Sequence, residues 1–122
     1  MNVSLKRNKQ DWVASYLTIW QGFMGLTERE VEVLTLIALR YLELQESVTE
    51  PKLLAELLLS AGARVALRAQ LGEEVPLSVN GLQNYLSSLQ KKEALLPLEG
   101  RLILNPKLVP QKTITFNFTS SD

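Results

Sequence analysis

Neither cysteine nor histidine occurs among the 122 residues of this sequence. Their absence excludes disulfides, a thiol nucleophile, a histidine general base and the usual zinc sites. Serine is plentiful, but no histidine is present to activate a serine as a nucleophile. The sequence also has no glycine-rich phosphate loop, no carboxylates at metal-binding spacing and no nucleophile elbow. We therefore expect a protein that is not an enzyme and that needs no cofactor, metal or small-molecule substrate.

Long apolar runs are also missing, since none reaches the roughly 18 residues of a membrane span. The basic residues near the start, Lys6, Arg7 and Lys9, are soon followed by Asp11, which is unlike a signal peptide. A chain without cysteine fits a reducing compartment. These features predict a cytoplasmic protein that makes no contact with membranes.

An excess of positive charge is missing as well, because 13 basic residues balance 13 acidic ones. Free domains that bind nucleic acid are usually basic. The charge is nevertheless unevenly distributed: residues 1–26 and 76–122 each carry a net charge of +2, and residues 27–50 carry −4. This distribution permits one weakly basic face.

The length and the hydrophobic fraction of 46% predict one domain with its own core over residues 1–122. The patterns divide it into an N-terminal arm or strand at residues 1–10 and a helix at residues 11–25. A core at residues 26–110 follows, and then a C-terminal strand and tail at residues 111–122.

Both ends of the chain alternate apolar and polar side chains, which is the pattern of a strand. The alternation covers residues 2–6 at one end and 112–118 at the other, where Ile114, Phe116 and Phe118 share one face. A single amphipathic strand needs a partner for its backbone. The N-terminal segment is one candidate partner, and another subunit or a different protein is the other.

The helix predicted at residues 11–25 begins with Asp11 as N-cap and carries an aromatic stripe. Trp12, Tyr16 and Trp20 recur along one side of it. Each tryptophan ring buries roughly 150–250 Å² when it is covered. The stripe either docks this helix on the domain core or forms an interface with a second copy or another protein.

A capping box predicts the start of a long central helix. Thr27 is the expected N-cap and Glu30 follows three residues later, while Leu26 and Val31 are placed as a hydrophobic staple. The helix should run to about Gln45. It is apolar around most of its circumference, so we expect it to be covered on more than one side.

Another helical region opens at Pro51, breaks at residues 60–62 and ends at Gly72. Arg64 and Arg68 lie one turn apart on a shared face of it. That face is either simply solvated or in contact with phosphates.

The stretch from Ser78 to Leu104 carries the clearest functional signal. Ser78 caps a helix whose apolar side contains Leu82, Tyr85, Leu86 and Leu89, with polar side chains opposite. Lys91 and Lys92 end this helix, and two apolar runs, residues 95–98 and 101–104, then meet at Glu99-Gly100, which suits a hairpin turn.

This order of helix, basic pair and hairpin resembles the recognition helix and wing of a winged helix-turn-helix. In layout, residues 26–110 are similar to small winged-helix proteins of bacteria and their phages. The resemblance implies a mainly α fold with a small β component that binds double-stranded DNA in replication, transcription control or packaging. The residues expected to contact DNA are Asn80, Gln83, Asn84, Ser87, Lys91, Lys92, Arg101, Arg64 and Arg68.

An assembly role is the alternative expectation, because a fold does not fix a function. Zero net charge, two tryptophans in one helix and amphipathic ends favour an oligomeric or virion-associated structural protein. The host cytoplasm or a virion would then be its location. The residues expected at such an interface are Trp12, Tyr16, Trp20, Ile114, Phe116 and Phe118.

Overall fold

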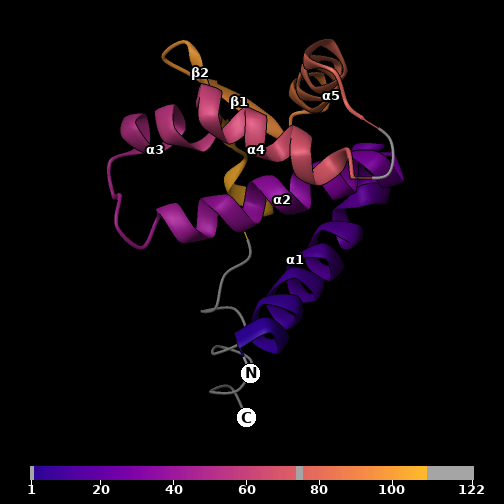
Figure 1. Cartoon of the computed structure of the whole chain (residues 1–122). Helices are drawn as coiled ribbons and strands as arrows, with labels where there is room; N and C mark the ends of the chain where they lie inside the picture. The colour runs from indigo at the N-terminus through magenta and orange to yellow at the C-terminus, as the bar shows by residue number, and fades with distance from the viewer. Residues whose placement is uncertain (1, 74–75, 110–122) are drawn as a thin grey trace.

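The computed structural model describes residues 2–73 and 76–109, and this part of the chain is mainly helical (Figure 1). The helices are α1 (Asn2–Met24), α2 (Glu28–Leu44), α3 (Pro51–Leu58), α4 (Ala61–Leu71) and α5 (Val79–Lys91). A small antiparallel sheet of β1 (Leu95–Leu98) and β2 (Arg101–Leu104) follows, and then the short 3-10 helix η1 (Pro106–Leu108). The predicted class, mainly α with a small β component, is therefore confirmed.

Helix α2 lies in the middle of the fold. In Figure 1, α1 runs below it, and α3, α4 and the β-hairpin lie above it. It packs against each of the other four described α-helices and against β2. Most of its apolar side chains are buried, as the sequence predicts for a central helix. The buried apolar residues of α2 are Val31, Val33, Leu34, Ile37, Ala38 and Leu42.

The start of α2 is the predicted capping box. The Thr27 hydroxyl accepts a hydrogen bond from the Glu30 backbone N–H, and the Glu30 carboxylate accepts one from the Thr27 N–H at 2.8 Å. Leu26 and Val31, the predicted staple, are both buried. These local contacts fix the direction in which the chain enters the central helix.

Two arginines of α2 hold the ends of neighbouring helices. Arg40 donates to the carbonyl of Leu57 at 2.8 Å, and Arg29 donates to the carbonyl of Leu71 at 2.7 Å. The last carbonyls of a helix have no partner within it, so a guanidinium there satisfies them and also interacts favourably with the helix dipole. Helices α3 and α4 are therefore fixed to α2 by charge-assisted bonds as well as by apolar packing.

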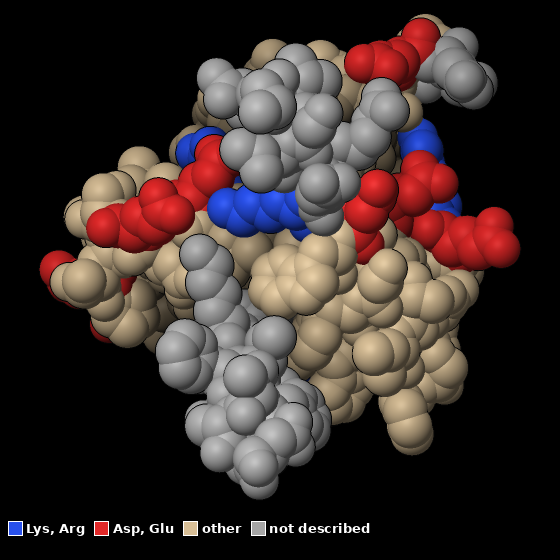
Figure 2. All heavy atoms as spheres, turned by 90° about the horizontal axis from the view of Figure 1, so that it is seen from below, with Lys and Arg blue, Asp and Glu red and all other residues tan. Residues whose placement is uncertain are grey.

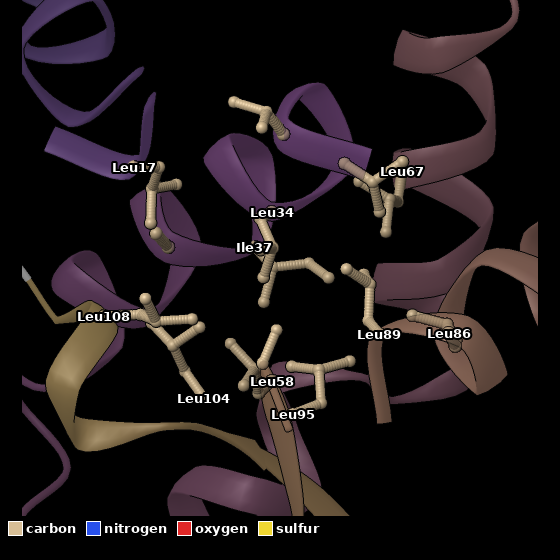
Figure 3. Packing of buried hydrophobic residues seen from close by; sticks show 14 of the residues in the cluster. Leu17, Leu34, Ile37, Leu58, Leu67, Leu86, Leu89, Leu95, Leu104 and Leu108 are labelled. Carbon is tan, nitrogen blue, oxygen red and sulfur yellow. The ribbon is translucent and has the colours of Figure 1, made fainter. Parts of the chain in front are cut away.

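The hydrophobic core is built from every helix and both strands. Figure 3 shows large aliphatic side chains converging between α1, α2, α5 and the hairpin. Complete burial of each side chain contributes roughly 1.5–3 kcal/mol through the hydrophobic effect. The largest fully buried side chains are Leu17, Leu34, Ile37, Leu58, Leu86, Leu89, Leu95, Leu104, Leu108, Val13 and Val33.

The predicted arm or strand at residues 1–10 is wrong for residues 2–10, which belong to α1. Asp11 is therefore inside a helix and is not its N-cap. The alternation over residues 2–6 is too short to outweigh the helix that follows it. Extending that helix satisfies the backbone groups within the segment, whereas a strand would need a partner. The C-terminal strand predicted at residues 112–118 lies outside the described residues.

The hairpin has the predicted bounds, with Leu95 opposite Leu104 and Leu98 opposite Arg101. Its turn residues Glu99 and Gly100 have φ values of 46° and 81°. Positive φ at both central positions is the geometry that matches the twist of the flanking strands. The order of the elements thus places a two-stranded hairpin directly after α5.

Candidate nucleic-acid interface

Helix α5 has one buried face and one open face. Leu82, Leu86 and Leu89 are almost completely buried, and α5 packs against α2, α4 and β1. The Ser78 hydroxyl accepts a hydrogen bond from the Gly81 N–H at 2.9 Å, which confirms the predicted N-cap. The side chains on the opposite face are all exposed; they are Asn80, Gln83, Asn84, Ser87 and Lys91.

A chain of polar contacts joins this open face to α4. Arg64 donates through Nη1 to Gln83 Oε1 at 3.4 Å, and Gln83 Nε2 donates to Ser87 at 3.3 Å. Arg64 also donates through Nε to the carbonyl of Leu59 at 3.0 Å, which holds its stem in place. The structure therefore brings Arg64, predicted from the sequence, next to the polar face of α5.

A shallow groove runs between α4 and α5, and Arg64 and Arg68 both line it. Val65 and Val79, on the two sides of this groove, are 57% and 64% exposed. Sequence reasoning missed this pair, because Val65 follows the apolar pattern of α4 and looks like a core residue. The open surface is thus a mixture of amide, guanidinium and aliphatic groups.

Lys92 does not belong to this open surface. Its ammonium group lies 2.6 Å from Glu30 Oε1, and Ser88 donates a hydrogen bond to the other carboxylate oxygen of Glu30. Glu30 is only 3% exposed and Lys92 is half-buried, so the ion pair joins the last turn of α5 to the first turn of α2 at the edge of the core. The expectation that Lys92 contacts phosphate stays a prediction, and the ion pair with Glu30 already neutralises the charge that such a contact would use.

The environment of Glu30 perturbs its acidity strongly. Burial raises the pKa of its carboxyl group, but hydrogen bonds from Lys92, Ser88 and the Thr27 backbone outweigh burial and lower the pKa to about 2. A carboxylate that accepts several bonds is stabilised in its charged form. Sequence reasoning gave Glu30 a capping role only. No local pattern indicates its partners, which lie 58 and 62 residues away along the chain.

Gly81 lies in the first turn of α5, beside the capping residue Ser78. A Cβ at this position would lie 2.8 Å from Leu77 Cδ1 and 3.2 Å from the Ser78 hydroxyl. A side chain at position 81 would require the end of the Leu77 side chain to move, and glycine itself destabilises a helix by roughly 1 kcal/mol relative to alanine.

Arg101 is exposed at the start of β2, next to the hairpin turn. In Figure 1 this turn lies above α3, and β2 contacts α3. The structure therefore does not bring Arg101 together with the side chains of α5. In Figure 1 the hairpin turn and α5 lie apart, on the left and the right of the upper part of the view.

The residues predicted at a protein interface have different environments. Tyr16 and Trp20 are half-buried against the core, and Tyr16 donates a hydrogen bond to the Lys107 carbonyl at 2.9 Å. Trp12 is 38% exposed. The other predicted residues lie outside the described part of the chain; these are Ile114, Phe116 and Phe118.

No family model, curated protein or solved structure matches this chain. Among the described residues there is no group of three or more acidic side chains placed to hold a metal ion. The same residues include no helix with both the length and the apolar character needed to cross a bilayer.

Figure 2 views the side on which α1 and α2 lie. Basic atoms form a short strip there, and acidic atoms lie on both sides of it. A broad positive field is absent from this view, which agrees with the net charge of zero.

Proposed function

We propose that this chain is a winged-helix domain that binds double-stranded DNA, with α5 as the recognition helix and the β1–β2 hairpin as the wing. The observation that carries the proposal is the open face of α5. One side of the helix packs on the core, and the other presents amide side chains to solvent beside Arg64. An α-helix fits into the major groove, where amides bind adenine edges with two hydrogen bonds.

The residues divide into two roles. Asn80, Gln83 and Asn84 are near the N-terminal half of α5, the part of a recognition helix that contacts base edges. Phosphates would be contacted by the surrounding cations and by one hydroxyl, which fix the register without reading sequence. These phosphate contacts are Arg64, Arg68, Ser87, Lys91 and, from the wing, Arg101.

Lys92 is left out of this assignment because Glu30 neutralises it. The remaining cations are few, so we expect weak binding. Its dependence on salt should be smaller than that of a protein with about six to ten phosphate contacts. The four cations among the five proposed contacts correspond to a slope of about −3.6 for log K against log salt on duplex DNA. A phage or bacterial role in replication, transcription control or packaging is consistent with the proposal, and it comes from the layout resemblance alone.

A titration of a labelled mixed-sequence duplex tests the proposal. Fluorescence anisotropy should show binding at 50 mM salt that weakens by about two orders of magnitude at 200 mM salt. No measurable binding at the lower salt concentration would refute it.

The alternative expectation, an assembly role, has one structural feature in its favour, an apolar stripe left open on α1. We assign this stripe to a segment of the same chain. DNA binding is therefore the function that we propose.

A further inference from the structure

Helix α1 carries a stripe of large apolar side chains that face solvent. Trp12, Ile19 and Phe23 are 38%, 65% and 82% exposed. Their spacing of seven and four residues places them on one side of the helix. Residues 12–27 contain no charged side chain, so any polar groups beside the stripe over these residues are uncharged. We call these three residues the α1 stripe.

The described chain ends beside this stripe. Tyr16 donates a hydrogen bond to the Lys107 carbonyl, and η1 contacts α1. The helical repeat places Tyr16 between the buried residues Val13 and Leu17 on one side and the α1 stripe on the other. Buried Val109 follows η1. The chain after Val109 therefore starts at the edge of the α1 stripe.

We propose that residues 112–118 cover the α1 stripe, with the side chains of Ile114, Phe116 and Phe118 packed against it. In an extended conformation these three residues would share one side, because side chains alternate along a strand. They span about 13 Å in that conformation, and the stripe spans about 16 Å along the helix. Ile114 is five residue steps beyond Val109, which is enough to reach about 17 Å.

A second copy of the chain is a weaker candidate for the same place. At exposures of 38%, 65% and 82%, the three side chains of the stripe offer roughly 400 Å² of apolar surface. A standard protein interface buries about 800 Å² on each partner, so the stripe is small for a stable dimer. A segment attached a few residues away has a high effective concentration and needs less area to stay bound.

The absence of cysteine provides a direct test in the full-length chain. The double variant Ile19→Cys with Phe116→Cys should form an intrachain disulfide when oxidised glutathione is added. The matched control, Ile19→Cys with Asn117→Cys, places the second thiol on the opposite side of the segment. We expect the first pair to cross-link at least tenfold faster, as measured by thiol labelling and mass spectrometry. Equal rates, no cross-link, or a cross-link mainly between two chains would each overturn the proposal.

A second measurement avoids cysteine substitutions. Phe116→Asp should expose the α1 stripe and increase the quenching of tryptophan fluorescence by acrylamide, whereas Thr115→Asp, on the other side of the segment, should leave quenching unchanged. Circular dichroism would establish that both variants are folded. Equal quenching in the two variants would contradict the proposal. None of these results depends on whether the protein binds DNA.

Discussion

Lys92 Nζ lies 2.6 Å from the Glu30 carboxylate and ties the end of α5 to the start of α2. Glu30 serves two structures at once, since it also closes the capping box with Thr27. The orientation of α5, and with it the direction of its open face, therefore depends on a buried charge at the first turn of another helix.

Acid should weaken the fold through Glu30. The pKa of Glu30 is lowered from 4.5 to about 2, so its contribution to stability is fully present above pH 4.5 and is lost as the pH falls toward 2. Glu30→Gln should remove this part of the pH dependence and should also lower stability at pH 7. Urea unfolding followed by circular dichroism at several pH values measures both effects. Exposed Glu56 on α3 provides the control Glu56→Gln. Equal acid sensitivity in wild type and Glu30→Gln would contradict the role given to Glu30.

The adjacent lysines at the end of α5 should behave differently. Lys92→Ala leaves the buried Glu30 charge with fewer partners and should lower the free energy of unfolding by about 2 kcal/mol. Lys91 is exposed, so Lys91→Ala should change the free energy of unfolding by less than about 0.5 kcal/mol. Chemical denaturation of the two variants makes the comparison. A similar loss in both would show that the Glu30 ion pair contributes nothing specific.

Glu93 occupies a backbone conformation that favours glycine. Its φ is 65°, and the Glu93 and Ala94 N–H groups close α5 by bonding to the Gln90 and Leu89 carbonyls. Glu93→Gly should stabilise the protein by about 0.5–1 kcal/mol, because a side chain is strained at this φ. Gln90→Gly, inside the same helix, should destabilise it by about 1 kcal/mol. Thermal denaturation of both variants tests the prediction. A lower melting temperature for Glu93→Gly as well as for Gln90→Gly would contradict it.

Gly62 in α4 and Gly72 at the C-terminal end of α4 should respond in opposite ways to substitution by alanine. A Cβ at Gly72 would lie 2.9 Å from the Arg68 carbonyl oxygen and from the Leu77 nitrogen, whereas a Cβ at Gly62 meets nothing within 4 Å. Gly72→Ala should cost about 1–3 kcal/mol through the backbone clash. Gly62→Ala should stabilise α4 by up to about 1 kcal/mol. The denaturant midpoints of the two variants measure the difference. Equal midpoints would contradict the close approach of the Arg68 and Leu77 backbone atoms to Gly72.

Local signals in the sequence predicted much of this fold. Three of these signals act within a few residues, and each predicts a boundary that the structure confirms. They are the capping box of Thr27 and Glu30, the N-cap Ser78, and the turn at Glu99-Gly100. The buried face of α5 follows from helical periodicity for the same reason.

Contacts between distant parts of the chain could not be predicted in this way. Lys92 and Lys91 look equivalent in sequence, and only the folded structure shows that Glu30 lies beside one of them. Arg29 and Arg40 likewise look like surface charges but bond to helix ends 42 and 17 residues away. Residues 2–6 show the opposite problem, because a short alternation there suggested a strand where α1 continues.

The central claim is that the open face of α5 binds duplex DNA, and one matched pair of variants tests it directly. Lys91→Ala and Lys52→Ala remove the same charge from exposed positions, one on α5 and the other on α3. In an anisotropy titration of a mixed-sequence duplex, Lys91→Ala should weaken binding several-fold and reduce the salt slope by about 1, while Lys52→Ala should bind like wild type. Equal affinities for all three proteins, or no binding by any of them at 50 mM salt, would contradict the claim.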